Sequence, residues 1–479
     1  MGRTRNAHCP DARATRWGCA LIAVSALWGC QTPAPKLPAQ TPPKPQLSYL
    51  NIPISIPLAP VAAAIDKEVP QSAGAAPFEL AINGGAGPPS CGVDAGYAVV
   101  RAPLSMSGVG DAIKTDLDLM YWVKGRKQIP CPGDYTTVSC GTNGEEPRTV
   151  KASIATAIAI LPDLTASVHS TLGPIVPGNR CVLNPVGLDV TDALMAGVAD
   201  GMKPVLANLD QRLAAGLQLR QRVEAGWARM NEPAELRPGI WLAMNPEGIG
   251  IVPISVENDT LRTGIQLRLR PIVEAGTKPE AGTRPLPIAD VAAPADTFEM
   301  QIPVEVEQSF VQARLDKALE VENGGTPVSL GNYKVRVTGA DVYGQGTQVV
   351  VKLLFKGDVN GTAYLRGTPY YDAKNRTLNF PDLDYTLETD RALLNSANWV
   401  AQGQIRERLR TRFTIEMERP IDDMKKSLES VLNRSRGNVT LHGNVQDLRL
   451  LGVYRLQDGN VFTAYLAATG KIWAEVDMQ

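Results

Sequence analysis

A strand followed by a short helix occurs twice in this sequence, and this repetition constrains the fold more than any other feature. Apolar residues alternate with polar residues and prolines around Ile52-Pro53 and again around Ile302-Pro303, a pattern typical of strands. A helical segment follows each strand and carries Asp66-Lys67 in the first case and Asp316-Lys317 in the second. Both matches have one offset (302 − 52 = 250 and 316 − 66 = 250), which indicates an internal duplication.

Each copy continues with a meander, a longer helix and a final run of strands. Apolar residues at a spacing of four predict the longer helix in both copies: Val205, Leu209, Leu213 and Leu217, and then Ile405, Leu409, Phe413 and Met417. Proline lacks the backbone N–H, so Pro53 and Pro57 predict that the first strand lies at a sheet edge or has one unpaired side. The sequence therefore predicts an α+β protein built from two tandem repeats.

The N-terminus has the features of an export signal. Four arginines among the first 16 residues precede an uncharged, mostly apolar stretch from Trp17 to Trp28. This stretch is shorter than the about 20 residues that a membrane-spanning helix needs, and no later segment of that length is free of charges. We therefore expect export without a transmembrane helix.

The end of this signal resembles a bacterial lipobox. Leu27-Trp28-Gly29-Cys30 has the expected leucine, glycine and cysteine, although Trp28 stands where a small residue is usual. The resemblance implies that Cys30 carries acyl chains that anchor the protein to a membrane. Gln31 then implies sorting to the inner leaflet of the outer membrane, facing the periplasm. The alternative is an ordinary secretory signal with an incidental cysteine.

The chain is too long for a single hydrophobic core, so several units are expected. Residues 30–46 are rich in proline and predict an extended tether, and residues 274–297 are rich in Pro, Ala and Gly and predict a linker. The expected divisions are a signal peptide at 1–29, the lipidated cysteine and tether at 30–46, a first repeat with disulfides at 47–273, the linker at 274–297 and a second repeat at 298–479.

Cysteine usage agrees with an oxidising compartment. Of seven cysteines, Cys9 and Cys19 leave with the signal and Cys30 carries lipid, so four remain (7 − 3 = 4): Cys91, Cys131, Cys140 and Cys181. An even number predicts two disulfides, with three pairings open. A zinc site is the rival interpretation, but the spacing between Cys131 and Cys140 does not suit a zinc knuckle.

The charged residues indicate neither nucleic-acid binding nor catalysis. A formal net charge of -1 gives no electrostatic reason to expect a nucleic acid. Once the signal is removed, only His169 and His442 remain for a metal site or a Ser-His-Asp triad, so we expect no metal, no cofactor and no catalytic residues. Two carboxylate pairs suit a solvated strand face better than a calcium or acid–base site: Asp116 with Asp118, and Asp382 with Asp384.

Three segments carry a resemblance to a known family. They are NIPISIPLAPVAAAIDKEVP from Asn51, WARMNEPAELRPGIWLAMNPEGI from Trp227 and GTPYYDAKNRTLNFPDLDYTLET from Gly367. They resemble a bacterial lipoprotein family known as domain of unknown function 4403. More distantly, the chain resembles the tubular lipid-binding superfamily, which includes bactericidal/permeability-increasing protein. This second resemblance implies an elongated, pseudo-symmetric body in which each repeat is a bent antiparallel sheet wrapped around a long helix.

The superfamily resemblance also implies an apolar ligand groove between helix and sheet. The candidates to line it are Ile52, Ile54, Ile56, Ile302, Val304, Val306, Leu409, Phe413 and Met417. The same residues suit a dry core equally well. We expect a non-catalytic envelope lipoprotein that binds or carries a lipid or another hydrophobic ligand. The alternatives are a scaffolding lipoprotein that binds another envelope protein and, least favoured, an enzyme.

Overall fold

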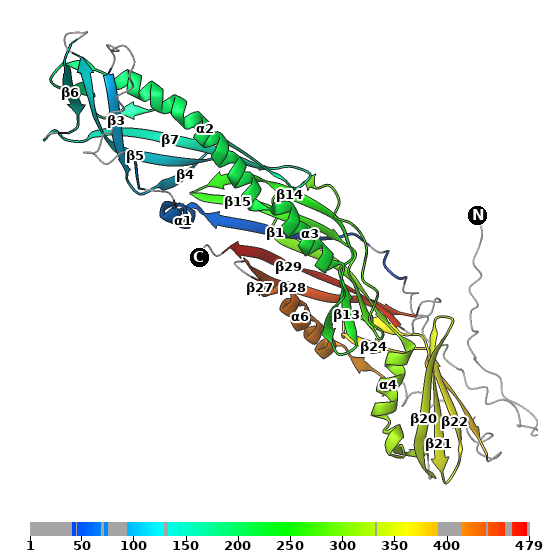
Figure 1. Cartoon of the computed structure of the whole chain (residues 1–479). Coiled ribbons are helices and arrows are strands. Elements are labelled where there is room, and N and C mark those ends of the chain that lie inside the picture. The colour runs from blue at the N-terminus through cyan, green and yellow to red at the C-terminus, as the bar shows by residue number, and fades with distance from the viewer. Residues whose placement is uncertain are drawn as a thin grey trace, which may run out of the picture. The chain divides into compact units, whose positions relative to one another are not determined.

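Strands make up most of the structure, in agreement with the predicted α+β class (Figure 1). The computed structural model describes residues 41–44, 46–68, 71–74, 93–128, 133–142, 144–330, 333–390, 413–436, 439–455 and 462–476. These residues belong to one compact unit, Ala39–Gln479. Among them, no helix combines the length and the apolar character that a membrane span needs.

An 11-stranded sheet, called here the main sheet, contains strands from both halves of the chain. Its central path runs β12 (Ala234–Arg237), β13 (Ile240–Ala243), β16 (Ile272–Ala275), β18 (Thr297–Val306), β29 (Phe462–Val476), β1 (Ser48–Pro57), β15 (Thr260–Leu269), β14 (Pro246–Glu257) and β17 (Asp290–Val291). β28 (Val439–Tyr454) pairs with β29, and β27 (Arg434–Arg436) pairs with β28. Most neighbours are antiparallel, so the bulk of the sheet follows the predicted class.

The first strand, β1, lies inside this sheet and not at its edge. One side of β1 pairs with β15 along its whole length, from Ser48 to Pro57. The other side makes only two short pairings, with β18 at Tyr49–Leu50 and with β29 at Ile54–Ser55. Pro53 and Pro57 fall outside these short pairings. Of the two predicted alternatives, the structure supports a strand with one sparsely paired side. The edge position is wrong.

An eight-stranded sheet precedes the longest described helix. Its path runs β2 (Ser72–Gly74), β3 (Val93–Arg101), β5 (Ala112–Gln128), β7 (Arg148–Ile160) and β8 (Ala166–Leu172), with β4 (Ser105–Val109) and β6 (Tyr135–Cys140) on β5 and β9 (Val176–Pro177) on β7. A small hairpin, β10 (Val182–Leu183) and β11 (Leu188–Asp189), leads into α2 (Thr191–Leu217). Gln218 has a positive φ of 43°, which ends α2 before α3 (Leu219–Met230).

The remaining described elements form two smaller sheets, three α-helices and one 3-10 helix. A five-stranded sheet contains β19 (Thr326–Leu330), β20 (Tyr333–Gln345), β21 (Gln348–Gly357), β22 (Gly361–Gly367) and β25 (Asp384–Thr389). A three-stranded sheet contains β23 (Tyr370–Asp372), β24 (Thr377–Asn379) and β26 (Ile415–Glu416). The helices outside the α2–α3 pair are α1 (Leu58–Glu68), α4 (Gln308–Ala318), α6 (Glu418–Leu432) and the short 3-10 helix η1 (Val321–Asn323).

The main hydrophobic core lies on one face of the main sheet. Trp227 of α3, Leu428 and Leu432 of α6, and strand residues such as Phe298 and Leu269 are buried there together. Figure 1 shows α3 and α6 beside the strands β1, β29 and β28. This core joins residues that are more than 400 positions apart in the longest case, from Leu50 to Ile472 (472 − 50 = 422).

The two matched strand–helix units adopt the same pair of elements. β1 leads into α1 (58–68), and β18 leads into α4 (308–318), again with an offset of 250 (308 − 58). The two strands also pair antiparallel with each other, at Tyr49 with Glu299 and Leu50 with Phe298. The duplication of the whole chain, with its pseudo-symmetry, stays a prediction.

Two expected segments take other forms. Phe413 lies in a turn, residues 415 and 416 form β26, and α6 begins at Glu418, so the helix predicted from the spacing of Phe413 and Met417 is wrong there. Pro420 agrees with this late start: proline is tolerated in the first turn of a helix, whereas in a helix continuing from Phe413 it would lie in the interior, where it lacks the N–H for a helical hydrogen bond. Residues 274–297, expected as a linker, contribute β17, which pairs with β14 as the last strand of the central path of the main sheet.

Candidate functional site

One face of the eight-stranded sheet carries a row of apolar side chains. Cross-strand partners share a face, and Leu117, Thr115 and Ile113 on β5 are paired with Ala152, Ile154 and Thr156 on β7. β8 continues this face with Val168 opposite Ile158 and Leu172 opposite Ile154. We call this surface the inner face, and its members used below are Leu117, Ile154, Ile158, Val168 and Leu172.

The inner face is only partly covered. All five of these side chains keep part of their surface exposed. None packs against a buried cluster formed by the described residues, whereas residues at both ends of the face do. At one end Leu119 joins the cluster of Tyr121, Val123 and Val150. At the other end Ile113 joins the cluster of Leu58, Val256 and Leu261.

The opposite, outer face of the sheet is polar. Asp116 and Asp118 alternate with the inner-face residues of β5 and form ion pairs with Lys114 (2.7 Å) and Lys151 (3.9 Å). Both carboxylates are exposed to solvent, which agrees with the solvated strand face expected from the sequence. Asp382 and Asp384 also make separate local contacts: Asp382 accepts from Thr368, and Asp384 pairs with Arg366.

Helix α2 lies along β8 and faces the inner face at its start (Figure 1). Leu194 and Met195 pack against the cluster of Tyr121 and Val150, and the backbone N–H of Ser170 donates to Asp210 Oδ2 at 3.0 Å. Farther along the helix, Leu206 is buried. Four others are exposed by 37–55%: Val198, Val205, Leu209 and Leu213.

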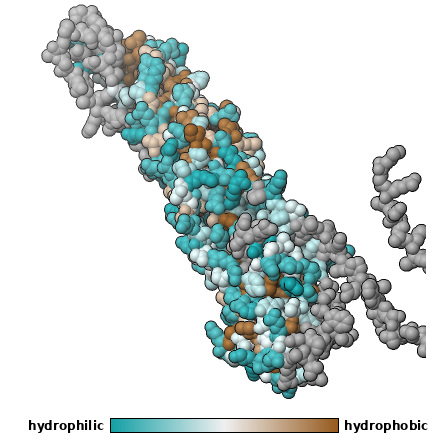
Figure 2. All heavy atoms as spheres, turned by 90° about the vertical axis from the view of Figure 1, so that its right-hand side faces the viewer, coloured by the Kyte–Doolittle hydropathy of each residue, from teal (hydrophilic) through white to brown (hydrophobic). Residues whose placement is uncertain are grey.

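The exposed residues and Leu206 belong to one helical stripe. Residues 198, 202, 205, 206, 209 and 213 recur at spacings of three and four, which places them on one side of α2. A helix with a fully packed apolar stripe would bury these residues against the sheet. In α2 four of these six residues are left in contact with solvent, next to a sheet face that is itself partly uncovered. Figure 2 shows patches of apolar side chains between hydrophilic ones on one face of the molecule.

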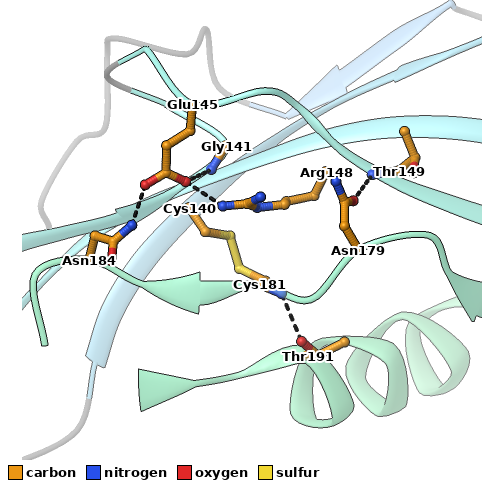
Figure 3. A network of polar contacts seen from close by, with 9 residues as sticks. All are labelled: Cys140, Gly141, Glu145, Arg148, Thr149, Asn179, Cys181, Asn184 and Thr191. Carbon is orange, nitrogen blue, oxygen red and sulfur yellow. Dashed lines mark hydrogen bonds and ion pairs between the residues drawn. A yellow bond between two sulfur atoms is a disulfide. The ribbon is translucent and has the colours of Figure 1, made fainter. Parts of the chain in front are cut away.

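A disulfide and a polar network hold the start of α2 (Figure 3). Cys140 at the end of β6 is bonded to Cys181, and both are fully buried. The backbone N–H of Cys181 donates to Thr191 Oγ1 at 2.8 Å, at the first residue of α2. Cys91 and Cys131 lie outside the described residues, as does Cys30.

Glu145 connects three segments beside this disulfide. It accepts hydrogen bonds from the Gly141 backbone N–H (3.0 Å), from Asn184 Nδ2 and from Arg148, with which it also forms an ion pair (Figure 3). The Gly141 N–H, followed by Asn184 and Arg148, lowers the pKa of Glu145 below its ordinary value. The charged carboxylate thus joins the turn after β6, the start of β7 and the β10 region.

An apolar cleft lies where the eight-stranded sheet meets the main sheet. It has a volume of about 390 Å³, and residues from β7, β14 and β17 line it, among them Ile158, Ile160, Ile251, Ile254 and Val291. We call it the junction cleft. Its volume lies in the range of small-molecule sites. The cleft is also lined by the cross-strand pairs Ala157–His169 and Ala159–Ser167, which lie on the outer face, so it is a surface separate from the inner face.

The candidate groove residues of β1 lie on the core-facing side of the main sheet. Ile52 packs at the border of the main core, and Ile56 packs against Leu58 and Val256 in the cluster that also receives Ile113 of the inner face. Ile52 and Ile54 line a separate depression of about 380 Å³ with a mixed polar and apolar wall. Ile56 therefore lies near the inner-face end at Ile113, but none of the three β1 candidates lines the junction cleft.

The other candidates lie elsewhere. Ile302 is 1% exposed in the filled main core, and Val304 and Met417 pack against that core from partly buried positions. Phe413 packs against Leu365 and Tyr385 of the five-stranded sheet. Val306 is partly buried opposite Phe462. Leu409 lies outside the described residues. The structure thus does not bring the candidates together in one groove.

The sequence reasoning missed the strands that form the inner face. The signal was present in SIATAIAI, residues 153–160, where isoleucine alternates with alanine and threonine. The outer-face positions 155, 157 and 159 are alanines, so polar and apolar residues alternate only weakly along this segment. In the part of the chain that the structure describes, no group of three or more His, Cys, Asp or Glu residues is arranged for a metal ion.

Comparisons with solved structures give low similarity scores. A lipopolysaccharide binding protein is 9% identical, with 91% of this chain and all of that chain covered and a TM-score of 0.26. The protein P47 of Clostridium botulinum E1 is 9% identical, with 90% and 98% covered and a TM-score of 0.21. P47 from Clostridium botulinum A2 is also 9% identical, with 88% and 96% covered and a TM-score of 0.20. Scores this low support no argument about function.

The family comparison covers nearly all of the described unit. No curated protein matches the sequence. The family described as "Domain of unknown function (DUF4403)" matches residues 46–476, which run from two residues before β1 through the end of β29. This confirms the resemblance carried by the segments around Asn51, Trp227 and Gly367, and the chain belongs to the DUF4403 family.

Proposed function

We propose that this protein binds a lipid or another apolar ligand between the inner face and α2. It carries the ligand and catalyses no reaction. Acyl chains on Cys30 anchor it to the outer membrane, and the proline-rich tether lets the body face the periplasm.

The observation that carries the proposal is the pair of apolar surfaces left partly exposed side by side. Ile154 and Ile158 of the inner face and Leu209 of α2 each retain contact with solvent. Removing apolar surface from water contributes about 25 cal/mol per Å². An acyl chain lying between these surfaces gains that contribution along its length, whereas a polar ligand gains nothing from such walls.

The disulfide supports the proposed compartment. Bonds such as Cys140–Cys181 form and persist mainly in oxidising compartments, which include the periplasm. The lipobox-like segment before Cys30 supports the anchor.

A protein partner is the second candidate function, and one observation favours it. Val198 and Val205 of α2 are 44% and 55% exposed, more than Leu209 and Leu213. Exposed apolar stripes on helices also serve as contact surfaces for other proteins. In this case α2 itself, and not the inner face, would be the site.

Native mass spectrometry with solvent extraction tests the proposal. Residues 39–479, exported behind a cleavable secretory signal, should copurify with a phospholipid or fatty acid. The change Ile158→Asp places a charge on the inner face and should abolish the bound lipid. Thr171→Asp is the matched control, because Thr171 is exposed on the outer face of β8, and it should retain the lipid. Circular dichroism confirms that both variants are folded.

A protein that stays empty when offered lipids would contradict the carrier function. Copurification of one defined protein that Val205→Asp abolishes, while Ile158→Asp leaves it in place, would instead establish the second candidate.

A further inference from the structure

Arg455 is a partly buried cation for which the described part of the chain supplies no partner. It follows β28 directly, and because Tyr454 is paired with Thr463, Arg455 lies next to Phe462 of β29. Its Nε and Nη1 atoms are buried and make no hydrogen bond. Among the residues that the structure describes, no carboxylate forms an ion pair with it. The side chain still keeps some exposed surface, so solvent reaches it.

Gly344 of β20 makes room for the guanidinium. A Cβ atom at this position would lie 1.8 Å from Arg455 Nε and 2.2 Å from Nη2. No side chain fits there while the guanidinium keeps its place. The surroundings are apolar, because Phe462 packs with Val342 and Val349 in a hydrophobic cluster.

This arrangement is costly unless something pairs with the cation. Buried polar groups in proteins are nearly always hydrogen-bonded, and an unpaired buried charge is among the least favourable groups in a folded chain. Arg449 of β28 is exposed to water and pairs with Asp447, whereas the Nε and Nη1 atoms of Arg455 are shielded from water. An anion with oxygen acceptors would supply the missing partners.

We infer that Arg455, in the space left by Gly344, binds an anionic oxygen group, either a carboxylate or a phosphate. The anion is free in solution or is the headgroup of an amphiphile whose chain lies against Val306 and Phe462, which are paired across β18 and β29. The site is built from β28, β20 and β29. It is therefore independent of the lipid site proposed on β7, β8 and α2.

Isothermal titration calorimetry at low ionic strength tests the inference with three probes. They are inorganic phosphate, dodecanoate and the uncharged dodecanol. Arg455→Gln should weaken binding of the anionic probes by about tenfold or more, since hydrogen bonds to a charged group are lost. Arg449→Gln is the control, because Arg449 is exposed and pairs with Asp447 at 2.7 Å, and it should change binding by less than about twofold.

The pattern of the probes identifies the source of the anion. An effect of Arg455→Gln on phosphate and dodecanoate alike indicates a free anion. An effect on dodecanoate alone indicates an amphiphile headgroup. Dodecanol should bind the wild type and Arg455→Gln equally in both cases.

A second variant guards against a folding defect in Arg455→Gln. Gly344→Ala keeps the charge but occupies the space of the guanidinium, so it should also weaken the anionic probes. Failure of the wild type to bind phosphate and dodecanoate, or equal binding by the wild type and both variants, overturns the inference. Failure of the proposed carrier function can be told apart from failure of this inference. A protein that is empty in mass spectrometry but still binds phosphate through Arg455 contradicts only the carrier function.

Discussion

The backbone N–H of Cys181 donates a hydrogen bond to Thr191 Oγ1 at 2.8 Å, and this bond joins the disulfide of Cys140 to the first residue of α2. The covalent link runs from β6, a strand of the eight-stranded sheet, to the segment that leads into the helix. The start of α2 is thereby held against the same sheet whose inner face it flanks. Changes at this link should affect both stability and ligand binding.

The double change Cys140→Ser and Cys181→Ser should lower the free energy of unfolding by about 2–4 kcal/mol. The disulfide closes a loop with a sequence separation of 41, and the cross-link reduces the entropy of the unfolded chain. Urea unfolding followed by circular dichroism measures the change. The wild type and the double variant should unfold at the same urea concentration when both are reduced. Equal stability of the oxidised and reduced wild type would contradict the prediction.

The carboxyl group of Asp189 should make the start of α2 sensitive to acid. Hydrogen bonds from Thr191, followed by the ion pair with Arg180, lower the pKa of Asp189 from 3.8 to about 2. The unfolded chain therefore takes up this proton at a higher pH than the folded chain. The stabilising contribution is complete above pH 3.8 and is lost as the pH falls to about 2.

Asp189→Asn should consequently lower the melting temperature near neutral pH and leave it unchanged near pH 2. Thermal unfolding of both proteins across this range measures the difference. Asp118→Asn is a suitable control, because Asp118 is exposed on the outer face and lies 3.9 Å from Lys151. A difference between wild type and Asp189→Asn that is constant with pH would show that the carboxylate charge is not responsible.

Trp227 should be a main support of the segment between β16 and β17. Its side chain is 2% exposed in the main core, and its Nε1–H donates to the Arg284 carbonyl at 2.9 Å. Trp227→Phe should cost about 1 kcal/mol for the lost hydrogen bond, and Trp227→Ala about 3–5 kcal/mol. Trp473→Phe, at a tryptophan that is 40% exposed, should change stability by no more than about 0.5 kcal/mol. Urea unfolding distinguishes these magnitudes.

Leu209 of α2 should matter more for ligand binding than for stability. It is 38% exposed, so Leu209→Ser should change the free energy of unfolding by no more than about 0.5 kcal/mol. Loss of its contact with an acyl chain should weaken lipid binding by about 1 kcal/mol, or roughly fivefold. A fluorescent fatty acid measures affinity, with Arg212→Ser on the exposed side of the helix as the control. Equal weakening by both changes would argue against contact between Leu209 and the ligand.

Local patterns were sufficient to predict several elements. Alternation around Ile52 and Ile302 predicted β1 and β18, and the spacing of Val205, Leu209 and Leu213 predicted part of α2. These patterns work because side-chain direction follows a fixed period of 2 in a strand and 3.6 in a helix. The same rule failed at Phe413 and Met417, where a strand pairing and Pro420 take precedence over the helical spacing.

The site depended on information that no local pattern holds. Ile54 and Ile158 have the same strand-like surroundings in the sequence, yet Ile54 lines a mixed depression and Ile158 the apolar junction cleft. The difference arises from the strands and helices that pack above each residue. Pro53 likewise suggested an edge strand or one with an unpaired side, and the structure places β1 inside the sheet through two short pairings with β18 and β29, more than 200 residues away.

The sequence by itself determined the α+β class, the strand–helix order of β1–α1 and β18–α4, and the membership of the DUF4403 family. Only the tertiary structure decided that Cys140 pairs with Cys181, that β1 lies inside the main sheet and that the inner face stays partly uncovered beside α2. The physical reason is the range of the interactions: alternation and helical period act between near neighbours, whereas strand pairing, cysteine pairing and burial depend on contacts between distant parts of the chain.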